Sequence, residues 1–202
     1  MKQALYNMIF FSTLILVSTL SCAQSKTYMD SLQSHIDGYV KDHEVVKEGD
    51  KKYLQFYPID QTYRVTAKFE KATNSQWFLM ETSGHEKKLY KVYGTVSFTI
   101  GDTPLKLNIY QSQDLLKDPE YKDYLLLLFT DKTSGNESYE SGRYLDFTAG
   151  DIKNNKLLID FNKAYNPYCA YEKNKYNCPI PPKENDLPVE IKAGEKKYAK
   201  NH

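Results

Sequence analysis

The chain has 202 residues, of which 41% are hydrophobic, 26% are charged and 14% are aromatic, and its formal net charge at pH 7 is +1. Such a chain can bury a core, and its length suits one domain behind a short leader. Lys2 is the only charged residue in positions 1–21, so the chain without that segment has 26 basic and 26 acidic side chains. A neutral body has no electrostatic reason to bind nucleic acid or an anionic membrane face, and we exclude both as expected partners of the body.

The first residues have the features of an export signal. Lys2 supplies a positive start, and residues 8–20 form an apolar stretch that is too short to span a membrane comfortably. The stretch ends at Thr19-Leu20-Ser21-Cys22, which resembles a bacterial lipobox, although Thr19 replaces the usual aliphatic residue. The resemblance implies that Cys22 carries fatty acids such as palmitate and becomes the new N-terminus. A plain cleaved signal and an uncleaved anchor are the alternatives.

A lipid on Cys22 predicts where the protein is found. It would tether the body to a membrane of the cell envelope, facing the periplasm or at the outer membrane, without spanning it. The membrane is then a partner through the N-terminal lipid. No acidic cluster directly follows Cys22, so the membrane leaflet stays open. The sequence also leaves the oligomeric state open.

One helix and then a run of strands follow along the chain. In residues 26–42, apolar side chains recur at helical spacing and predict an amphipathic helix: Tyr28, Leu32, Ile36, Tyr39 and Val40. From residue 62 the period changes to two, and residues 62–70 place Tyr63, Val65, Ala67 and Phe69 on one face. Residues 76–82 predict a short strand. Residues 89–100 predict a longer one, whose inward face would be Tyr90, Val92, Gly94, Val96, Phe98 and Ile100.

Further strands are predicted at 104–112, 124–129, 142–147 and 156–162. Residues 124–129, YLLLLF, are apolar without interruption, which is typical of a strand that is covered on both sides. About eight strands joined by hairpin-like turns predict a mainly β fold, an antiparallel meander that closes into a barrel or packs as a sandwich. The predicted organisation is a signal peptide at 1–21, a tether and helix at 22–45, and a single β-rich domain at 46–198. Its residues 163–198 form an irregular strap.

The end of the chain carries a long motif. It comprises Gly142 to Leu145, Asp160 to Pro167, Cys169-Ala170-Tyr171, Cys178 to Pro182, Asn185, Leu187 and Gly194-Glu195. In order and spacing this resembles the bacterial family known as domain of unknown function 1684, and the likeness extends over most of residues 50–196. The resemblance implies no particular activity.

Cys169 and Cys178 are separated by eight residues and would lie in an oxidising compartment after export. With Cys22 lipidated they are the remaining pair, so a disulfide is the simplest reading. Free structural thiols, a thiol nucleophile and a metal site are the alternatives. A zinc site needs four ligands, and the tail offers two cysteines and no histidine before His202, so we expect no metal and no cofactor. Pro179, Pro181 and Pro182 favour an extended strap across the mouth or edge of the sheet.

Two arginines stand out among 25 lysines. A guanidinium that binds a carboxylate or phosphate through two parallel bonds cannot be replaced by lysine, so we expect a fixed partner for at least one of them. Together with polar residues of the tail motif they form the ligand-binding candidates: Arg64, Arg143, Asp160, Asn162, Tyr165, Asn166, Asn185 and Glu195. A ligand with hydroxyls or a carboxylate would suit them. Alternatively, Asp160 and Glu195 pair with the arginines, and the asparagines cap turns.

Enzyme signatures are scarce. The sequence has no Gly-x-Ser-x-Gly elbow, no phosphate-binding glycine loop and no zinc-protease helix. His85 is the sole histidine of the strand region and could act as a general base beside Glu86. We therefore favour a non-catalytic envelope lipoprotein that binds a small polar ligand or an envelope partner. The alternative is a hydrolase-like enzyme with a carboxylate, histidine and asparagine site under the strap.

Overall fold

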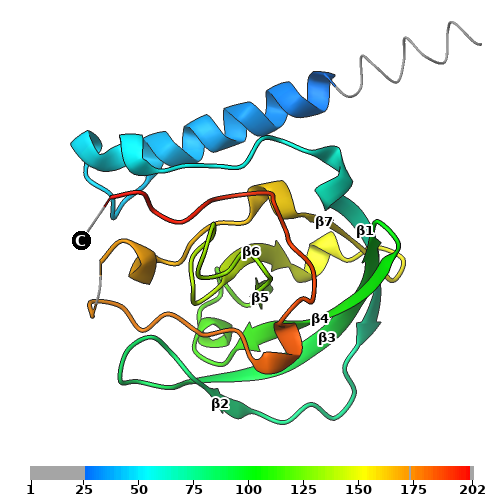
Figure 1. Cartoon of the computed structure of the whole chain (residues 1–202). Coiled ribbons are helices and arrows are strands. Elements are labelled where there is room, and N and C mark those ends of the chain that lie inside the picture. Colours follow the sequence, from blue (N-terminus) through cyan, green and yellow to red (C-terminus); the bar gives the residue numbers. More distant parts are fainter. Residues whose placement is uncertain (1–25, 173, 201–202) are drawn as a thin grey trace, which may run out of the picture. The chain divides into compact units, whose positions relative to one another are not determined.

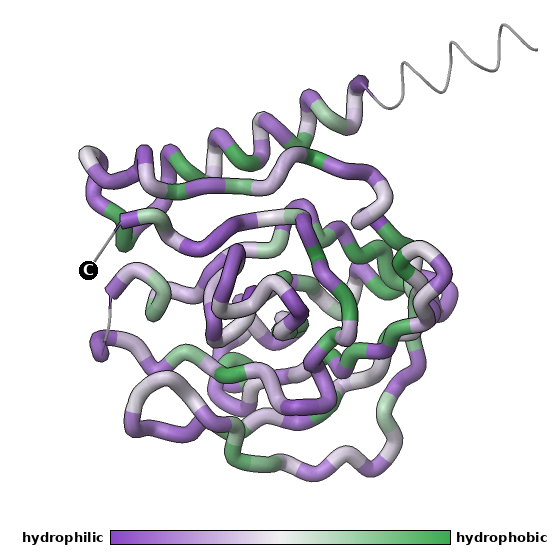
Figure 2. The backbone as a smooth tube through the Cα atoms, viewed as in Figure 1, coloured by the Kyte–Doolittle hydropathy of each residue, from purple (hydrophilic) through white to green (hydrophobic). Residues whose placement is uncertain are grey.

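The computed structural model describes residues 26–172 and 174–200. The chain divides into two compact units, Met1–Asp42 and His43–His202. The predicted signal peptide and Cys22 lie outside the described residues. In the first unit, residues 26–42 form an α-helix, along which hydrophobic residues are interspersed with hydrophilic ones (Figure 2). None of the described helices has an apolar stretch that could cross a membrane.

The second unit is built on one antiparallel sheet. Its strands are β1 (Arg64–Lys71), β2 (Phe78–Met80), β3 (Lys88–Ile100), β4 (Thr103–Ser112), β5 (Tyr124–Phe129), β6 (Arg143–Thr148) and β7 (Lys156–Asp160). Short 3-10 helices connect and follow them: η1 (Glu48–Tyr53), η2 (Gln61–Tyr63), η3 (Leu115–Lys117), η4 (Ala149–Asp151), η5 (Phe161–Lys163), η6 (Tyr168–Ala170) and η7 (Lys183–Asn185).

The strand order is β6-β5-β4-β3-β1-β7, with β2 paired to β3 off this path. All pairs are antiparallel, which confirms the mainly β, antiparallel prediction. The sheet curls into a half-barrel whose two ends are β6 and β7, and it is neither a closed barrel nor a sandwich (Figure 1). The sheet contains seven strands, and each overlaps one of the seven ranges named from the sequence, where about eight strands were expected.

Two hydrophobic clusters cover the two faces of β5. Leu125, Leu127 and Phe129 belong to the larger cluster, and Leu126 and Leu128 belong to the smaller one. All five side chains are buried. The prediction that this apolar run is covered on both sides is confirmed, because alternate residues of a strand point to opposite faces.

The side chains predicted to face inward in 89–100 do pack in hydrophobic clusters, but they do not share one face as predicted. A β-bulge lies between Val92 and Gly94 and leaves Tyr93 as the extra residue in the pairing with β4. An inserted residue moves the side chains beyond it to the opposite face. The two halves of β3 therefore pack in different clusters, with Tyr90 and Val92 in the smaller one and Val96 and Phe98 in the larger one.

Residues 161–200, here called the C-terminal segment, contain short 3-10 helices and single bridges but no strand among their described residues. The segment is drawn from orange to red in Figure 1 and passes beside several strands and loops. Its bridges pair Tyr165 with Tyr144, Pro179 with Thr82, Asp186 with Thr130, and Glu195 with Phe56. Backbone hydrogen bonds accompany each contact, such as Tyr144 N to Tyr165 O at 2.9 Å and Leu187 N to Thr130 O at 2.8 Å.

Candidate functional site

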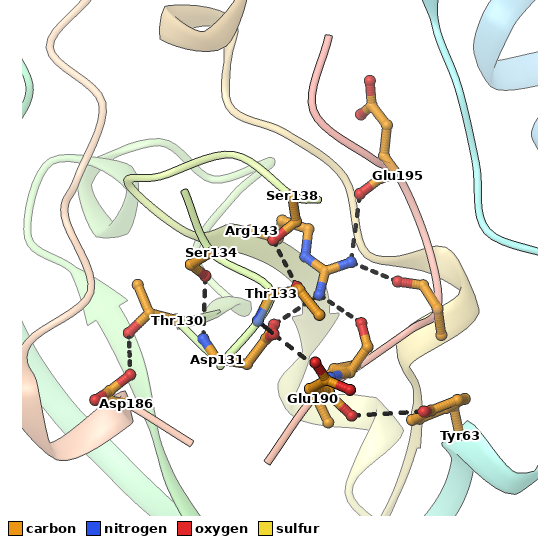
Figure 3. A network of polar contacts seen from close by, with 12 residues as sticks. Tyr63, Thr130, Asp131, Thr133, Ser134, Ser138, Arg143, Asp186, Glu190 and Glu195 are labelled. Atoms are coloured by element: carbon orange, nitrogen blue, oxygen red, sulfur yellow. Dashed lines mark hydrogen bonds and ion pairs between the residues drawn. The ribbon is translucent and has the colours of Figure 1, made fainter. Parts of the chain in front are cut away.

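Arg143 begins β6 and is buried, with 1% of its side chain exposed. Its guanidinium donates to three main-chain carbonyls of the C-terminal segment. Nη2 bonds Ile191 O at 2.8 Å, and Nη1 bonds Ala193 O and, at 3.3 Å, Glu195 O. Figure 3 shows dashed lines running from the Arg143 guanidinium to Glu195 and to its neighbours, and the three carbonyls belong to alternate residues of the segment. Arg143 therefore holds together parts of the chain that are about fifty residues apart.

Asp131 supplies the charge that balances Arg143. Its Oδ2 accepts from Arg143 Nη2 at 2.7 Å, and its side chain is fully buried. Its Oδ1 accepts from Thr133 N at 2.6 Å and Ile191 N at 3.4 Å (Figure 3). One bond thus joins this carboxylate to the arginine, where two parallel bonds were expected. Asp131 is not among the residues selected from the sequence, because it lies in a loop between β5 and β6 without a distinguishing pattern.

Aromatic rings complete the surroundings of the guanidinium. The Arg143 Cζ atom lies 5.3 Å from the centre of the Phe129 ring and 5.8 Å from that of Tyr57. These distances are in the range of cation–π contacts. Burial also raises the pKa of Tyr57. The site is an internal cation whose two terminal nitrogens bond carbonyls and one carboxylate, while its buried Nε makes no hydrogen bond within the described residues.

Gly194 allows the C-terminal segment to turn close to its neighbours. Its φ is +76°, in a region that L-residues rarely adopt. A Cβ atom there would lie 2.5 Å from Ala164 O and 2.7 Å from Phe161 O. The positive φ and the close contacts each require a glycine at this position. Gly194 lies between Ala193 and Glu195, whose carbonyls Arg143 Nη1 binds.

Asn185 takes the place of a strand partner where β4 and β5 part. The two strands pair at Tyr110 and Leu126, and two residues further along that register Asn108 would lie opposite Leu128. There Asn185 Oδ1 accepts from Asn108 N at 2.8 Å, and its Nδ2 donates to Asn108 O at 2.9 Å and Leu128 O at 2.7 Å. A buried amide side chain thus satisfies backbone groups that the sheet leaves open.

Asn162 acts in the same way at the start of the domain. Its Oδ1 accepts from Asp60 N at 3.0 Å, and its Nδ2 donates to Asp60 O at 2.8 Å. Asp160 Oδ1 accepts from the same Nδ2 at 3.0 Å. Arg64 lies beside Asp160, with its Nε 4.0 Å from Asp160 Oδ2, so this part of the predicted pairing is present.

Glu195 is fully buried and holds a turn of the C-terminal segment. Its Oε2 accepts from Asn166 N at 2.9 Å, and Tyr171 donates its hydroxyl to Oε1 at 2.7 Å. Asn166 Nδ2 donates to Lys196 O at 2.8 Å. Arg143 contacts the main-chain oxygen of Glu195, whereas the carboxylate that it binds belongs to Asp131.

Tyr165 lies at the outer edge of β6. It exchanges two backbone hydrogen bonds with Tyr144, and its hydroxyl donates to Asp146 at 2.8 Å. The predicted ligand-binding candidates therefore do not gather in one place. They lie around residues 191–196, at the junction of β1 and β7, between β4 and β5, and at the edge of β6.

Cys169 and Cys178 form a disulfide, with an S–S distance of 2.09 Å and Cα atoms 6.3 Å apart. The Ser83 hydroxyl donates to Cys169 Sγ at 2.8 Å, and Ser83 N donates to Cys178 O at 2.9 Å. The disulfide reading of the sequence is confirmed over the thiol and metal alternatives. Within residues 26–172 and 174–200, no group of three His, Cys, Asp or Glu side chains is placed to hold a metal ion.

These features define a class of protein: an antiparallel half-barrel whose irregular C-terminal segment is attached to it by a buried arginine, buried amides and a disulfide. The chain belongs to the family described as "Protein of unknown function (DUF1684)", whose model matches residues 51–196. This confirms the family resemblance seen in the tail motif.

A solved structure supports the fold. The chain is similar to an uncharacterised protein of Haloarcula marismortui solved by solution NMR, with 26% sequence identity and a TM-score of 0.63. The similarity covers 86% of this chain and 96% of that one. None of the curated proteins compared with the chain matches it.

Proposed function

We propose that the protein is a non-catalytic lipoprotein of the bacterial cell envelope. Its half-barrel serves as a module that binds a small polar ligand or an envelope partner, and its C-terminal segment is a strap that closes the half-barrel. The observation that carries this proposal is the Arg143 network. Arg143 donates its hydrogen bonds to the carbonyls of Ile191, Ala193 and Glu195 and to the carboxylate of Asp131. These bonds stabilise the fold and leave the terminal nitrogens no role in binding a ligand.

The positions of the other candidates support a structural role for the strap. Asn162 and Asn185 direct both their oxygen and their nitrogen at main-chain groups. Glu195 is bound to a main-chain amide and a phenol. Side chains whose polar atoms are all hydrogen-bonded within the protein stabilise its fold. A ligand would then be bound by polar groups outside this network.

The contacts of His85 give no support to the hydrolase alternative. His85 is exposed in the loop before β3. In the part of the chain that the structure describes, no hydrogen bond or ion pair joins His85 to a carboxylate. A general base needs such an orienting partner or a substrate within hydrogen-bond reach.

The envelope location rests on the leader and the disulfide together. The leader ends at Cys22 in a lipobox-like motif. The Cys169–Cys178 disulfide suits an exported protein, because disulfides persist outside the reducing cytosol. The two features are independent, since one lies in the leader and the other in the C-terminal segment.

Metabolic labelling tests the anchor. The full-length chain is expressed in a Gram-negative host that is fed radiolabelled palmitate, and membrane and soluble fractions are compared. We expect labelled protein in the membrane fraction, loss of the label in Cys22→Ala, and retention of the label in the control Ser21→Ala. If the wild-type chain takes up no palmitate, the lipid anchor is wrong.

A further inference from the structure

Asp146 is an exposed carboxylate that receives two tyrosine hydroxyls. It lies in β6 and points to the face of the smaller hydrophobic cluster, as Tyr144 does. Tyr124, from β5, donates to its Oδ1 at 2.6 Å, and Tyr165, from the C-terminal segment, donates at 2.8 Å. Tyr165 also lies 3.0 Å from Oδ2. Three separate parts of the chain thus meet at one surface carboxylate.

Within the described part of the chain, this carboxylate has no cationic neighbour. Among the residues that the structure describes, no lysine or arginine nitrogen lies within 4.0 Å of it, although lysines are abundant in the chain. Exposed carboxylates elsewhere in the chain, such as Glu70 and Asp114, do have lysine partners. Asp146 therefore keeps an unneutralised charge that faces solvent.

The hydroxyl hydrogens of Tyr124 and Tyr165 are both used in hydrogen bonds to Asp146. Each phenol carries one hydrogen, and both are directed at Asp146. Burial, reinforced by the charge of Asp146, raises the pKa of Tyr124 and of Tyr165 far above the ordinary value of a tyrosine. Both phenols stay protonated at neutral pH and keep donating inward. A carboxylate can accept about four hydrogen bonds, so Asp146 retains outward lone pairs.

Aromatic rings of the smaller hydrophobic cluster lie beside Asp146. The rings of Tyr144 and Tyr165 are 5.9 Å apart in a T-shaped arrangement, and Tyr124 packs against the same cluster. Aromatic rings beside a carboxylate favour organic cations, because the ring faces are partly negative. The site offers negative charge and outward lone pairs beside the partly buried rings of Tyr124 and Tyr165, and an anionic ligand would be repelled by it.

We propose that Asp146, flanked by Tyr124 and Tyr165, binds the ammonium group of a small primary amine. The ammonium would donate to the outward lone pairs of Asp146 while its alkyl part lies against the tyrosine rings. This proposal rests on the binding role proposed above and is independent of the lipid anchor. It replaces the earlier expectation of a carboxylate ligand, because an acceptor surface requires a donor, and it narrows the expected donor from a hydroxyl to a charged N–H group.

Calorimetric titration of the purified full-length chain with 1,4-diaminobutane and with butylamine tests the site. Asp146→Asn should weaken binding by about tenfold or more, since hydrogen bonds to charged groups are worth roughly that factor. Asp102→Asn is the matched control, because it removes the same charge from an exposed turn. It should change the dissociation constant by less than about twofold, as expected for a remote surface charge.

Two further probes separate the contribution of the positive charge from that of the N–H donors. Butanol carries no charge and should not bind, and tetramethylammonium has no N–H donor and should bind more weakly than butylamine. Equal binding of tetramethylammonium, or an equal loss in Asp102→Asn and Asp146→Asn, would overturn the proposal.

A measurement on the wild-type chain avoids any dependence on how a variant folds. With ¹³C-labelled carboxyl groups, butylamine should shift the Asp146 carboxyl resonance and leave that of Asp102 in place. If neither resonance moves, the site is wrong. The palmitate labelling of Cys22 would be unaffected by that result.

Discussion

Arg143 Nη2 lies 2.7 Å from Asp131 Oδ2, and at most 1% of either side chain is exposed to solvent. Removing two charges from water costs several kcal/mol each, and the cost is offset only where the remaining hydrogen-bonding groups are satisfied. Here they are largely satisfied by the carbonyls of Ile191, Ala193 and Glu195, all in the C-terminal segment. The charge pair and the position of the segment therefore depend on each other.

Arg143→Lys is expected to destabilise the protein by about 1–3 kcal/mol, which is the usual cost of leaving buried hydrogen-bonding groups without a partner. A lysine has one nitrogen and cannot reach three carbonyls and a carboxylate at once. Urea unfolding followed by circular dichroism measures the change. Arg64→Lys is the matched control, because its side chain is 44% exposed and its ion pair with Asp160 spans 4.0 Å, so it should cost less than about 1 kcal/mol. Equal losses in the two variants would mean that the Arg143 network does not stabilise the fold.

Asn185→Asp is expected to destabilise the protein more than Asn185→Ala does. The aspartate has nearly the same shape, but it places an oxygen where Nδ2 now donates to Asn108 O and Leu128 O. Alanine removes the bonds, at about 1–3 kcal/mol for the backbone groups left unsatisfied. Aspartate adds repulsion between oxygens and buries a charge, so its cost should exceed that figure. Urea unfolding at pH 7 checks the order.

Asn154→Asp, at an exposed position, provides the control for Asn185→Asp. It makes the same chemical change in solvent and should alter stability by less than about 0.5 kcal/mol. If Asn185→Asp is no worse than Asn185→Ala, the amide nitrogen is not acting as a donor between the two strands.

The strands could be predicted from the sequence because alternation is a local property. The run at 124–129 and the alternation in β1 were sufficient to place both strands and their buried faces. The bulge at Tyr93 was missed, because the extra residue is defined only by the partner strand β4. Local periodicity contains no information on such pairing.

The candidate site was predicted by residue type but without its partners. Arg143 was selected because arginine is rare in this chain, and it does have a fixed carboxylate. That carboxylate, Asp131, lies in a loop and has no distinguishing local pattern. Asp146 was missed for the same reason, since its tyrosine partners come from β5 and the C-terminal segment. The disulfide was predictable, because export and the cysteine count leave one pair.

Reduction of the Cys169–Cys178 disulfide is expected to lower the stability of the protein by about 2–3 kcal/mol, because the bond closes a loop of about ten residues in the unfolded chain. Urea unfolding with and without a reducing phosphine measures the loss. The double variant Cys169→Ala and Cys178→Ala should show a similar stability and no response to the phosphine. A wild-type chain whose unfolding midpoint is unchanged on complete reduction would contradict the prediction.

The stability of the protein is expected to fall as the pH rises from about 10 towards 12, because buried tyrosines hold their protons more tightly in the folded state. Burial raises the pKa of Tyr90 and of Tyr110 to about 12. A hydrogen bond with Ser112 partly opposes the rise for Tyr90, and one with Asn108 does so for Tyr110. Below pH 10 both states keep these protons and stability is unaffected. Above pH 10 the unfolded chain loses them first, so each such tyrosine removes about 1.4 kcal/mol per pH unit until its folded pKa is reached.

Absorbance at 295 nm, which reports tyrosinate, measures this titration in the folded chain and in urea. The folded chain should show a late fraction that is absent in urea, and Tyr90→Phe and Tyr110→Phe should each reduce it. Tyr121→Phe is the control, because it makes the same substitution at a position that is 43% exposed. A single transition near pH 10 in the folded chain would show that these phenols are open to solvent, and the smaller cluster would then not be packed as the structure has it.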